Sequence, residues 1–213
     1  MLLELSQVIY AVRDLESAAQ RITALGLTML DGGRHPGLGT ANRIVPLGSS
    51  YFELLGVVDE REALSNNFGH ALLAQLQQGD HLVRWSLRTD NIDQVAAERG
   101  LIPEQRSRRR PDGVLLSWRA AGLGLSLQEG WLPFFMQWDD PAQYPGVLPV
   151  QHTLRVHGIA WLEITPRDDQ LLQRWLRSTH VPLRIVPGDP GIHRVGLSVE
   201  KNVLILPDGN MAY

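Results

Sequence analysis

The sequence predicts an α+β fold built from repeated strand–helix–strand units. Three observations indicate this fold. A segment rich in β-branched and aromatic residues precedes a helix with an N-cap and a glycine stop, and extended segments follow that helix. The same order returns from residue 82 and, in shorter form, from residue 158. Because a repeat of this length is a stronger signal than any single segment, we predict paired βαβββ units with a third, partial βαβββ unit at the C-terminus.

The first unit begins with residues 7–12 (QVIYAV), which are typical of a buried strand. Asp14 stands at the N-cap position, where a short acceptor side chain can bond the free N–H groups of the first turn. Residues 15–25 carry apolar side chains at helical spacing, and Gly26 ends the helix. Three extended segments are predicted to follow, at residues 27–30, 42–47 and 51–58.

The second unit repeats this order. Residues 82–89 (LVRWSLRT) predict a strand, Asn91 is placed to cap a helix, and Gly100 ends that helix. Extended segments are predicted at residues 101–104, 114–120 and 123–129, the last two joined by a short glycine-containing turn. Between the two units, residues 60–78 predict a helix, in which Gly69 is the unfavourable residue.

The third unit is shorter. Residues 159–165 predict a strand, and the apolar spacing of residues 171–176 predicts a helix. Short strands are expected at residues 183–186, 195–199 and 203–206, whereas residues 138–156 are proline-rich and predict an irregular crossing. We therefore expect residues 1–137 to form the paired domain, and residues 138–213 to be a linker and a third unit packed on the same domain.

Composition restricts the classes of function. The formal net charge is −3 and the isoelectric point is near 6.1, whereas a general nucleic-acid binder normally has a basic face. The chain has no cysteine, which excludes disulfides, thiolate ligands and a cysteine nucleophile. No apolar run is long enough to span a bilayer, and we expect no signal peptide. We expect a cytoplasmic protein whose partner is a small molecule, without nucleic-acid or membrane partners.

Several motifs resemble a known family. AVRDLESAAQR after the first strand and YFELL at the end of the first unit resemble the vicinal oxygen chelate superfamily, which includes glyoxalase I, extradiol dioxygenases and bleomycin-resistance proteins. HPGLGTANRIVPLG, followed later by PFFMQWDDP, is similar to the glyoxalase-like domain group within it. The resemblance implies mixed sheets that curve around one central cleft.

The resemblance also implies where a metal would be held. In metal-dependent members, the first and last strands of each unit supply ligands to a divalent ion that polarises two substrate oxygens. Glu53 matches the usual last-strand glutamate, but Gln7 stands in place of the first-strand histidine. In the second unit, Arg84 aligns with Gln7, and the counterpart of Glu53 falls at Ser126 or Gln128. Because a guanidinium has no free lone pair and catalytic zinc has about three protein ligands, we expect no metal cofactor.

Without a metal, the cleft becomes a polar pocket. Side chains alternate along a strand, so Glu53 is expected to face the cleft while Phe52 and Leu54 face the helix layer. Glu53 is thus the candidate catalytic residue, as a proton acceptor. Two readings of Arg84 stay open: a buried ion pair with Glu53, or a fork that receives an anionic group of the ligand.

Further candidates come from one loop and one aromatic run. His35, Thr40 and Asn42 flank a loop whose glycines allow its backbone to approach a ligand. Trp131 and Phe135 belong to an aromatic run that either packs in the core or covers the cleft. The predicted ligand-binding residues are Gln7, His35, Thr40, Asn42, Arg84, Gln128, Trp131 and Phe135. The arginines of residues 107–113 (SRRRPDG) are interpreted as a solvated hairpin tip.

These residues predict a glyoxalase-like protein that binds a small polar or anionic molecule in its central cleft without the usual metal. A lyase or isomerase step with Glu53 as the base stays open. The alternative is a metal-dependent lyase or dioxygenase. A third possibility is a sequestering protein that acts as a homodimer, as in the drug-resistance branches of the superfamily. A fold of this kind does not name its substrate.

Overall fold

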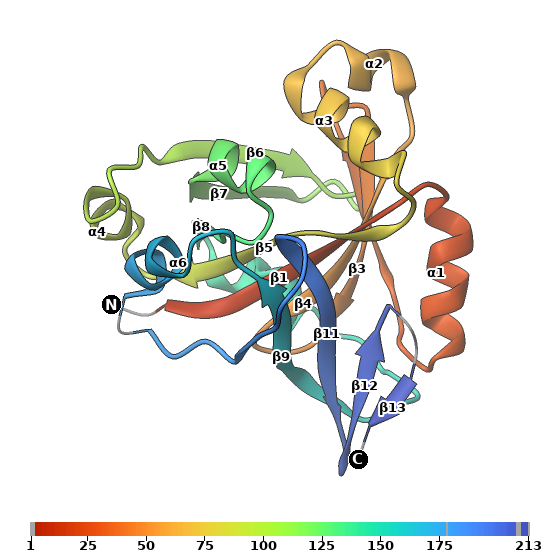
Figure 1. Cartoon of the computed structure of the whole chain (residues 1–213). Coiled ribbons are helices and arrows are strands. Elements are labelled where there is room, and N and C mark those ends of the chain that lie inside the picture. The colour runs from red at the N-terminus through yellow and green to blue at the C-terminus, as the bar shows by residue number, and fades with distance from the viewer. Residues whose placement is uncertain (1–2, 178, 208–209, 213) are drawn as a thin grey trace.

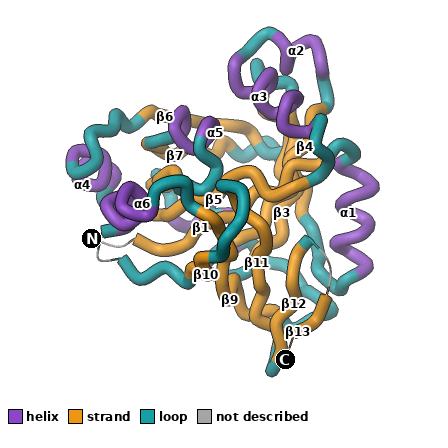
Figure 2. The backbone as a smooth tube through the Cα atoms, in the orientation of Figure 1, coloured by secondary structure: helices purple, strands orange, loops and turns teal. Residues whose placement is uncertain are grey.

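The structure, a computed structural model, describes residues 3–177, 179–207 and 210–212. Its strands form two sheets, one of eight strands in the order β2-β3-β4-β1-β5-β8-β7-β6 and one of five in the order β10-β9-β11-β12-β13 (Figures 1 and 2). The large sheet holds the two principal units, with β1 and β5 side by side at its centre. The small sheet belongs to the C-terminal part of the chain.

The first unit consists of β1 (Leu3–Val12), α1 (Leu15–Ala24), β2 (Leu30–His35), β3 (Thr40–Pro46) and β4 (Tyr51–Val57). Asp14 caps α1 as predicted, because its side chain accepts from the amide of Ser17 at 2.9 Å. The first extended segment, however, begins at Leu30 and not at residue 27. Thr28 instead bonds the crossing segment, through its amide to His152 and its hydroxyl to the carbonyl of Gln151.

The segment between the units forms two helices where the sequence predicts one. These are α2 (Glu60–Leu64) and α3 (Asn67–Leu76). Asn66 separates them, since its extended backbone ends α2 and its side chain accepts from the amide of Gly69 at 2.8 Å. A second N-cap inside the apolar pattern thus breaks the helix.

The second unit consists of β5 (His81–Thr89), α4 (Ile92–Ala97), β6 (Glu104–Arg109), β7 (Leu115–Ala121), α5 (Leu123–Gln128) and β8 (Phe134–Trp138). Asn91 caps α4 as predicted, accepting from the amide of Gln94 at 3.1 Å. The strand predicted at residues 123–129 is wrong: this segment is helix α5, and Gly122, at φ +81°, turns the chain into it. The last strand of the unit is therefore β8.

The large sheet curves until its two edge strands meet. Gly33 in β2 has φ +104°, and a Cβ placed on it would lie 3.4 Å from the carbonyl oxygen of Arg109 in β6. The sheet is thus nearly closed into a barrel. The first strand of each unit runs parallel to the last strand of that unit, β1 beside β4 and β5 beside β8.

The C-terminal segment consists of β9 (Val156–Thr165), α6 (Asp169–Leu176), β10 (Leu183–Ile185), β11 (Gly191–Val199), β12 (Asn202–Leu206) and β13 (Asn210–Ala212). The crossing before it is irregular, as predicted, with short 3-10 turns at Pro141–Gln143 and Pro145–Val147. Here β9 lies between β10, which is parallel, and β11, which is antiparallel. The third unit therefore follows the predicted order of elements but pairs its strands differently from the first.

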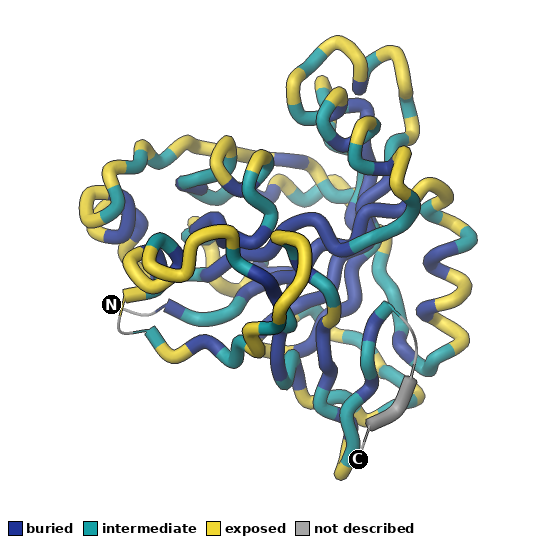
Figure 3. Tube along the Cα trace, in the orientation of Figure 1, coloured by how far each residue is buried: buried dark blue, intermediate teal, exposed yellow. Residues whose placement is uncertain are grey.

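Alternation along the strands separates two buried layers. Phe52 and Leu54 pack in the main core beneath α1, as predicted, whereas Ile9 and Leu55 point to the inside of the curved sheet. The main core continues into the C-terminal segment, where the indole nitrogen of Trp175 donates to the carbonyl of Pro133 at 2.8 Å. Figure 3 shows this continuous buried centre. Among the described residues, no helix is long and apolar enough to cross a membrane.

Candidate functional site

The inside of the curved sheet holds a cavity of about 490 Å³. The first turn of α3 and the inner face of α5 also line it, through Asn66, Asn67, Phe68, Leu123 and Leu127. Each strand of the large sheet contributes at least one side chain, in sheet order His35, Asn42, Glu53, Gln7, Arg84, Phe134, Trp118 and Arg108. Both principal units of one chain therefore build the cavity together.

Glu53 lies at the centre of a polar cluster on β1, β3 and β4. It is 7% exposed, and the amide nitrogen of Gln7 donates to its Oε2 at 3.5 Å. The hydroxyl of Tyr51, itself buried, donates to the amide oxygen of the same Gln7. Burial raises the pKa of Glu53 above its usual range, although the side chain of Asn42 and the charges of Arg108 and Arg84 oppose the shift. This carboxyl group is thus held where ionisation is costly.

The side chains of His35 and Thr40 are hydrogen-bonded to each other. The hydroxyl of Thr40 lies 2.8 Å from Nδ1 of His35, and Thr40 is fully buried beneath the histidine, which lines the cavity in its place. Burial, together with the positive charge of Arg108, lowers the pKa of His35 to about 4. The imidazole is therefore neutral at physiological pH and offers a hydrogen bond without a charge.

Arg84 is held in a fixed orientation. Its Nε donates to the hydroxyl of Ser126 at 3.0 Å, and its Nη2 donates to the carbonyl of Leu123 at 2.9 Å. The guanidinium stacks on the ring of Phe134, with 4.8 Å from Cζ to the ring centroid, and lies 5.6 Å from that of Phe68. Burial lowers its pKa to about 10.

The alternative of a direct ion pair between Arg84 and Glu53 is not realised. Within the described part of the chain, no carboxylate oxygen lies within 4.0 Å of the Arg84 guanidinium, whose hydrogen bonds go to Ser126 and Leu123. Glu53 and Arg84 still attract each other across the cavity, since each favours the charged form of the other. The guanidinium thus keeps its charge without a carboxylate in contact.

Arg108 is a cavity residue that the sequence interpretation missed. The three even-numbered side chains Glu104, Arg106 and Arg108 of β6 line the cavity. Arg108 is 7% exposed, and no hydrogen-bond acceptor of the described residues reaches its buried Nη1. Burial lowers its pKa, while Glu53 and Tyr51 oppose the shift. The prediction of a solvated tip is wrong for Arg108 but fits Arg109, whose side chain is exposed.

Three predicted ligand-binding residues lie elsewhere. Gln128 is exposed at the end of α5, because its segment is a helix. Trp131 is buried, and its indole nitrogen donates to Glu129 at 2.6 Å. Phe135 packs in the main core, with its ring 5.9 Å from that of Trp175. Its neighbour Phe134 lines the cavity instead, because adjacent residues of a strand face opposite sides.

The structure also corrects which residue of the second unit corresponds to Glu53. In β1, Ile9 pairs with Glu53, and in β5 the residue at the same distance from the helix cap, Ser86, pairs with Phe134. Phe134 is thus the counterpart of Glu53, in place of the predicted Ser126 or Gln128.

The residues at the metal positions do not fit a divalent cation. These positions hold Gln7, Glu53, Arg84 and Phe134, so only two of the four have an oxygen to offer, and a cation stands at a third. In the parts of the chain that the structure describes, no three histidine, aspartate or glutamate side chains come together to hold a metal ion.

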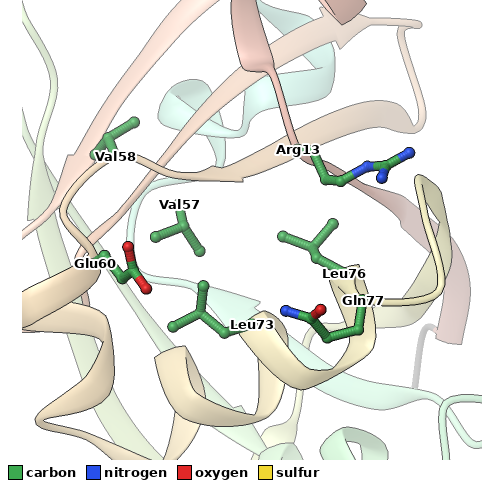
Figure 4. A pocket seen from close by; sticks show the side chains of 7 residues that line it. All are labelled: Arg13, Val57, Val58, Glu60, Leu73, Leu76 and Gln77. Atoms are coloured by element: carbon green, nitrogen blue, oxygen red, sulfur yellow. The ribbon is translucent and has the colours of Figure 1, made fainter.

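A second hollow lies outside the barrel, between the ends of β1 and β4 and helices α2 and α3 (Figure 4). Its volume is about 410 Å³, and it is lined by Arg13, Val57, Val58, Glu60, Leu73, Leu76 and Gln77. The charged side chains at its rim, Arg13 and Glu60, are exposed to solvent. The buried polar side chains that a specific site needs are found in the barrel cavity.

Comparison with known proteins agrees with this geometry. The sequence pattern of a family described as glyoxalase-like domain matches residues 7–180. A hypothetical protein from Staphylococcus aureus has a similar structure, with a TM-score of 0.66 and 16% identity over 94% of this chain and 83% of that chain. The comparison with curated proteins gives no match.

Two methylmalonyl-CoA epimerases are also among the similar structures, at lower TM-scores. A methylmalonyl-CoA epimerase from Streptomyces coelicolor is 18% identical, with a TM-score of 0.49, over 66% of this chain and 100% of that chain. The enzyme from Mycobacterium tuberculosis is 17% identical, with a TM-score of 0.45, over 63% and 86%. The family pattern covers most of the sequence, and the chain belongs to the glyoxalase-like domain family.

Proposed function

We propose that the protein binds a small anionic or polar molecule in the barrel cavity, without a divalent metal. The observation that carries this proposal is a pair of buried guanidinium groups, Arg84 and Arg108, that line one cavity and have no carboxylate within 4.0 Å among the described residues. Buried charges are normally paired. An anionic ligand would supply the missing partner.

The two arginines approach the cavity from different sides. Arg84 comes from β5, beside the central β1, and Arg108 comes from the edge strand β6, which the closure of the sheet brings against β2. Glu53 lies within electrostatic reach of both. The neutral groups of Gln7, His35 and Asn42 add hydrogen-bonding capacity around the same carboxyl group. The cavity volume of about 490 Å³ falls within the ordinary range for small-molecule sites.

Thermal stabilisation of the full chain by small carboxylic acids tests the proposal. A ligand at a hundred times its Kd stabilises the folded state by about 2.7 kcal/mol, which a melting experiment resolves. Arg108→Gln should weaken binding roughly 10- to 100-fold, because a hydrogen bond to a charged group contributes about 1.5–3 kcal/mol. Arg84→Gln should act in the same direction.

Arg109→Gln is the matched control. Arg109 is the next residue of β6, but its exposed side chain is on the outer face and donates to the carbonyl of Gly113 at 2.7 Å. This variant should bind as the unmodified protein does. Equal ligand stabilisation in Arg108→Gln, Arg84→Gln and Arg109→Gln would show that the cavity arginines do not hold the ligand.

Metal analysis tests the metal-free part of the proposal. The alternative of a metal-dependent lyase or dioxygenase requires ligands that the positions of Arg84 and Phe134 do not offer. Protein purified without chelator should contain zinc, nickel, manganese and iron only at levels far below one per chain. A stoichiometric amount of any of these would contradict the proposal.

Glu53 supports proton transfer as a further step at this site. A carboxyl group whose pKa is raised by burial is a stronger base once ionised, and a general base works best when its pKa is near the working pH. A lyase or isomerase step with Glu53 as proton acceptor is the simplest chemistry for it. If Glu53→Gln leaves both ligand stabilisation and any activity unchanged, Glu53 has no such role.

A further inference from the structure

The cavity wall opposite Glu53 is aromatic. Trp118 in β7 and Trp138 in β8 are directly opposite each other in the antiparallel pair, and their ring centroids lie 5.2 Å apart with a tilt of 34°. Both rings line the cavity and both are only partly buried. Of the other aromatic side chains that line the cavity, Phe68 and Phe134 are engaged by the guanidinium of Arg84, and Tyr51 donates its hydroxyl to Gln7. The tryptophan pair is thus the surface on which a flat ligand can stack.

Arg108 is a diagonal neighbour of Trp118 on the same face of the sheet, and Arg106 is the residue directly opposite Trp118. Arg108 pairs with Leu116 in β7, and Trp118 is two residues further along that strand. Diagonal neighbours of this kind have a separation of about 7–8 Å. A carboxylate bound by Arg108 is therefore within one small molecule of a ring stacked on Trp118.

Several cavity residues carry unpaired polar atoms. Six buried side-chain atoms of the described residues lack a hydrogen-bond partner, and three of them belong to cavity residues: Nη1 of Arg108, Nε1 of Trp138 and Oδ1 of Asn42. Buried polar groups are otherwise nearly always bonded. Two of these three atoms are donors, which fits an acceptor such as a carboxylate.

The charge and volume of the cavity restrict the class of ligand further. Three arginines and two glutamates line the cavity, so a ligand with one negative charge balances it. A cavity of about 150 Å³ holds one benzene ring, and the volume of about 490 Å³ accommodates two fused rings and an acid group.

We propose that the ligand is a ring-bearing monocarboxylic acid, with its carboxylate on Arg108 and its ring system against Trp118 and Trp138. This inference rests on the proposed function, because it names the chemical class of the anion that the cavity binds.

Calorimetric titration of the full chain with three probes tests it. The probes are 2-naphthoate, its uncharged amide 2-naphthamide, and propionate, which has the acid without the ring. The unmodified protein should bind 2-naphthoate at least tenfold more tightly than either of the others. Trp118→Leu should weaken the binding of 2-naphthoate about tenfold or more. Arg108→Gln should reduce the ratio between the affinities for the acid and for its amide. The affinity of Arg109→Gln for 2-naphthoate should stay within twofold of that of the unmodified protein.

The outcomes separate the two proposals. If propionate binds as tightly as 2-naphthoate, the ring assignment is wrong and anion binding in the cavity stands. If 2-naphthamide binds as tightly as 2-naphthoate, the carboxylate assignment is wrong. If neither acid binds, both this inference and the proposed function are overturned. The probe preference of the unmodified protein decides among these outcomes even if Trp118→Leu fails to fold.

Discussion

Glu53 is a carboxyl group in a place where its charge is poorly solvated. Its pKa is raised mainly by burial, and Arg108 and Arg84 compensate only in part because neither is in direct contact. A carboxyl group with a raised pKa in the folded state favours folding below its unfolded pKa, and this contribution is lost as the pH rises through the folded pKa. The ionised form thus lowers the free energy of unfolding at neutral pH.

Replacement of this carboxyl group should therefore stabilise the protein at neutral pH. Glu53→Gln removes the group that resists ionisation, so its free energy of unfolding should exceed that of the unmodified protein at pH 8. The difference should shrink towards pH 3, which lies below the ordinary glutamate pKa of about 4.3, so that Glu53 holds its proton in both states. Urea unfolding at the two pH values measures it. A difference that is the same at both would contradict the raised pKa.

His35 has the opposite pH dependence. Its pKa of about 4 in the folded state lies below the ordinary value near 6.5, so between these values the unfolded chain binds the additional proton. The contribution of His35 to stability is therefore present above pH 6.5 and lost as the pH falls towards 4, by at most about 3 kcal/mol. The imidazole resonances of His35 should stay in the neutral position from pH 8 to 5, and a midpoint near 6.5 would contradict this account.

At the scale of elements, the helix pair α2 and α3 depends on close backbone contacts. A Cβ on Gly69 would lie 2.5 Å from the Cα of Ala63 in α2, and one on Gly39 would lie 2.3 Å from the carbonyl oxygen of Asp59. Gly69 therefore lies inside α3 because the neighbouring helix packs against it. This contact matters for the site, since the first turn of α3 lines the cavity.

Gly69→Ala should consequently destabilise the protein, although alanine normally favours a helix by about 1 kcal/mol over glycine. Overpacking should cost about 1–3 kcal/mol, measured by urea unfolding. Gly124→Ala in α5 is the control, because nothing lies within 4 Å of its added Cβ. It should be neutral or stabilising. If both alanines behave alike, packing against Ala63 is not the reason for Gly69.

At the scale of the whole molecule, one core joins the barrel to the C-terminal segment. Trp175 of α6 bonds the carbonyl of Pro133, and Nε of Arg99, at the end of α4, donates to the carbonyl of Trp175 at 2.6 Å. We therefore propose that residues 138–213 pack as part of the same folding unit as residues 1–137. The full chain should melt in a single transition, with equal calorimetric and van't Hoff enthalpies. Two separate transitions would contradict this.

The composition of the cavity wall bears on whether the protein needs to form a homodimer. All eight strands that line the cavity come from one chain, so we propose that ligand binding does not require a second subunit. We expect one ligand per chain and an affinity that does not change with protein concentration. Titration at two protein concentrations checks this, and half a ligand per chain would point to a cleft shared between subunits.

Alternation of side chains explains both the successes and the errors of the sequence predictions. In β4 the strand was placed correctly, so Glu53 faces the cavity as predicted. In residues 123–127 (LGLSL), leucines at every second position predict a strand, yet positions 123 and 127 are also one helical turn apart. The structure forms a helix there, with Leu125 41% exposed. Because of that error, the last strand of the second unit was predicted at residues 123–129 and not at β8. Gln128 and Phe135 were therefore predicted to bind the ligand, whereas Phe134 lines the cavity.

Local sequence by itself determined the caps, the glycine stops, the order of strands and helices and the position of Glu53, because these depend on side chains within a few residues of each other. Only the tertiary structure decided that β6 closes against β2 and turns Arg108 into the cavity, and that Arg84 is held by Ser126 instead of Glu53. These contacts join residues far apart in the chain. Their geometry depends on how far the whole sheet curves, which no single segment encodes.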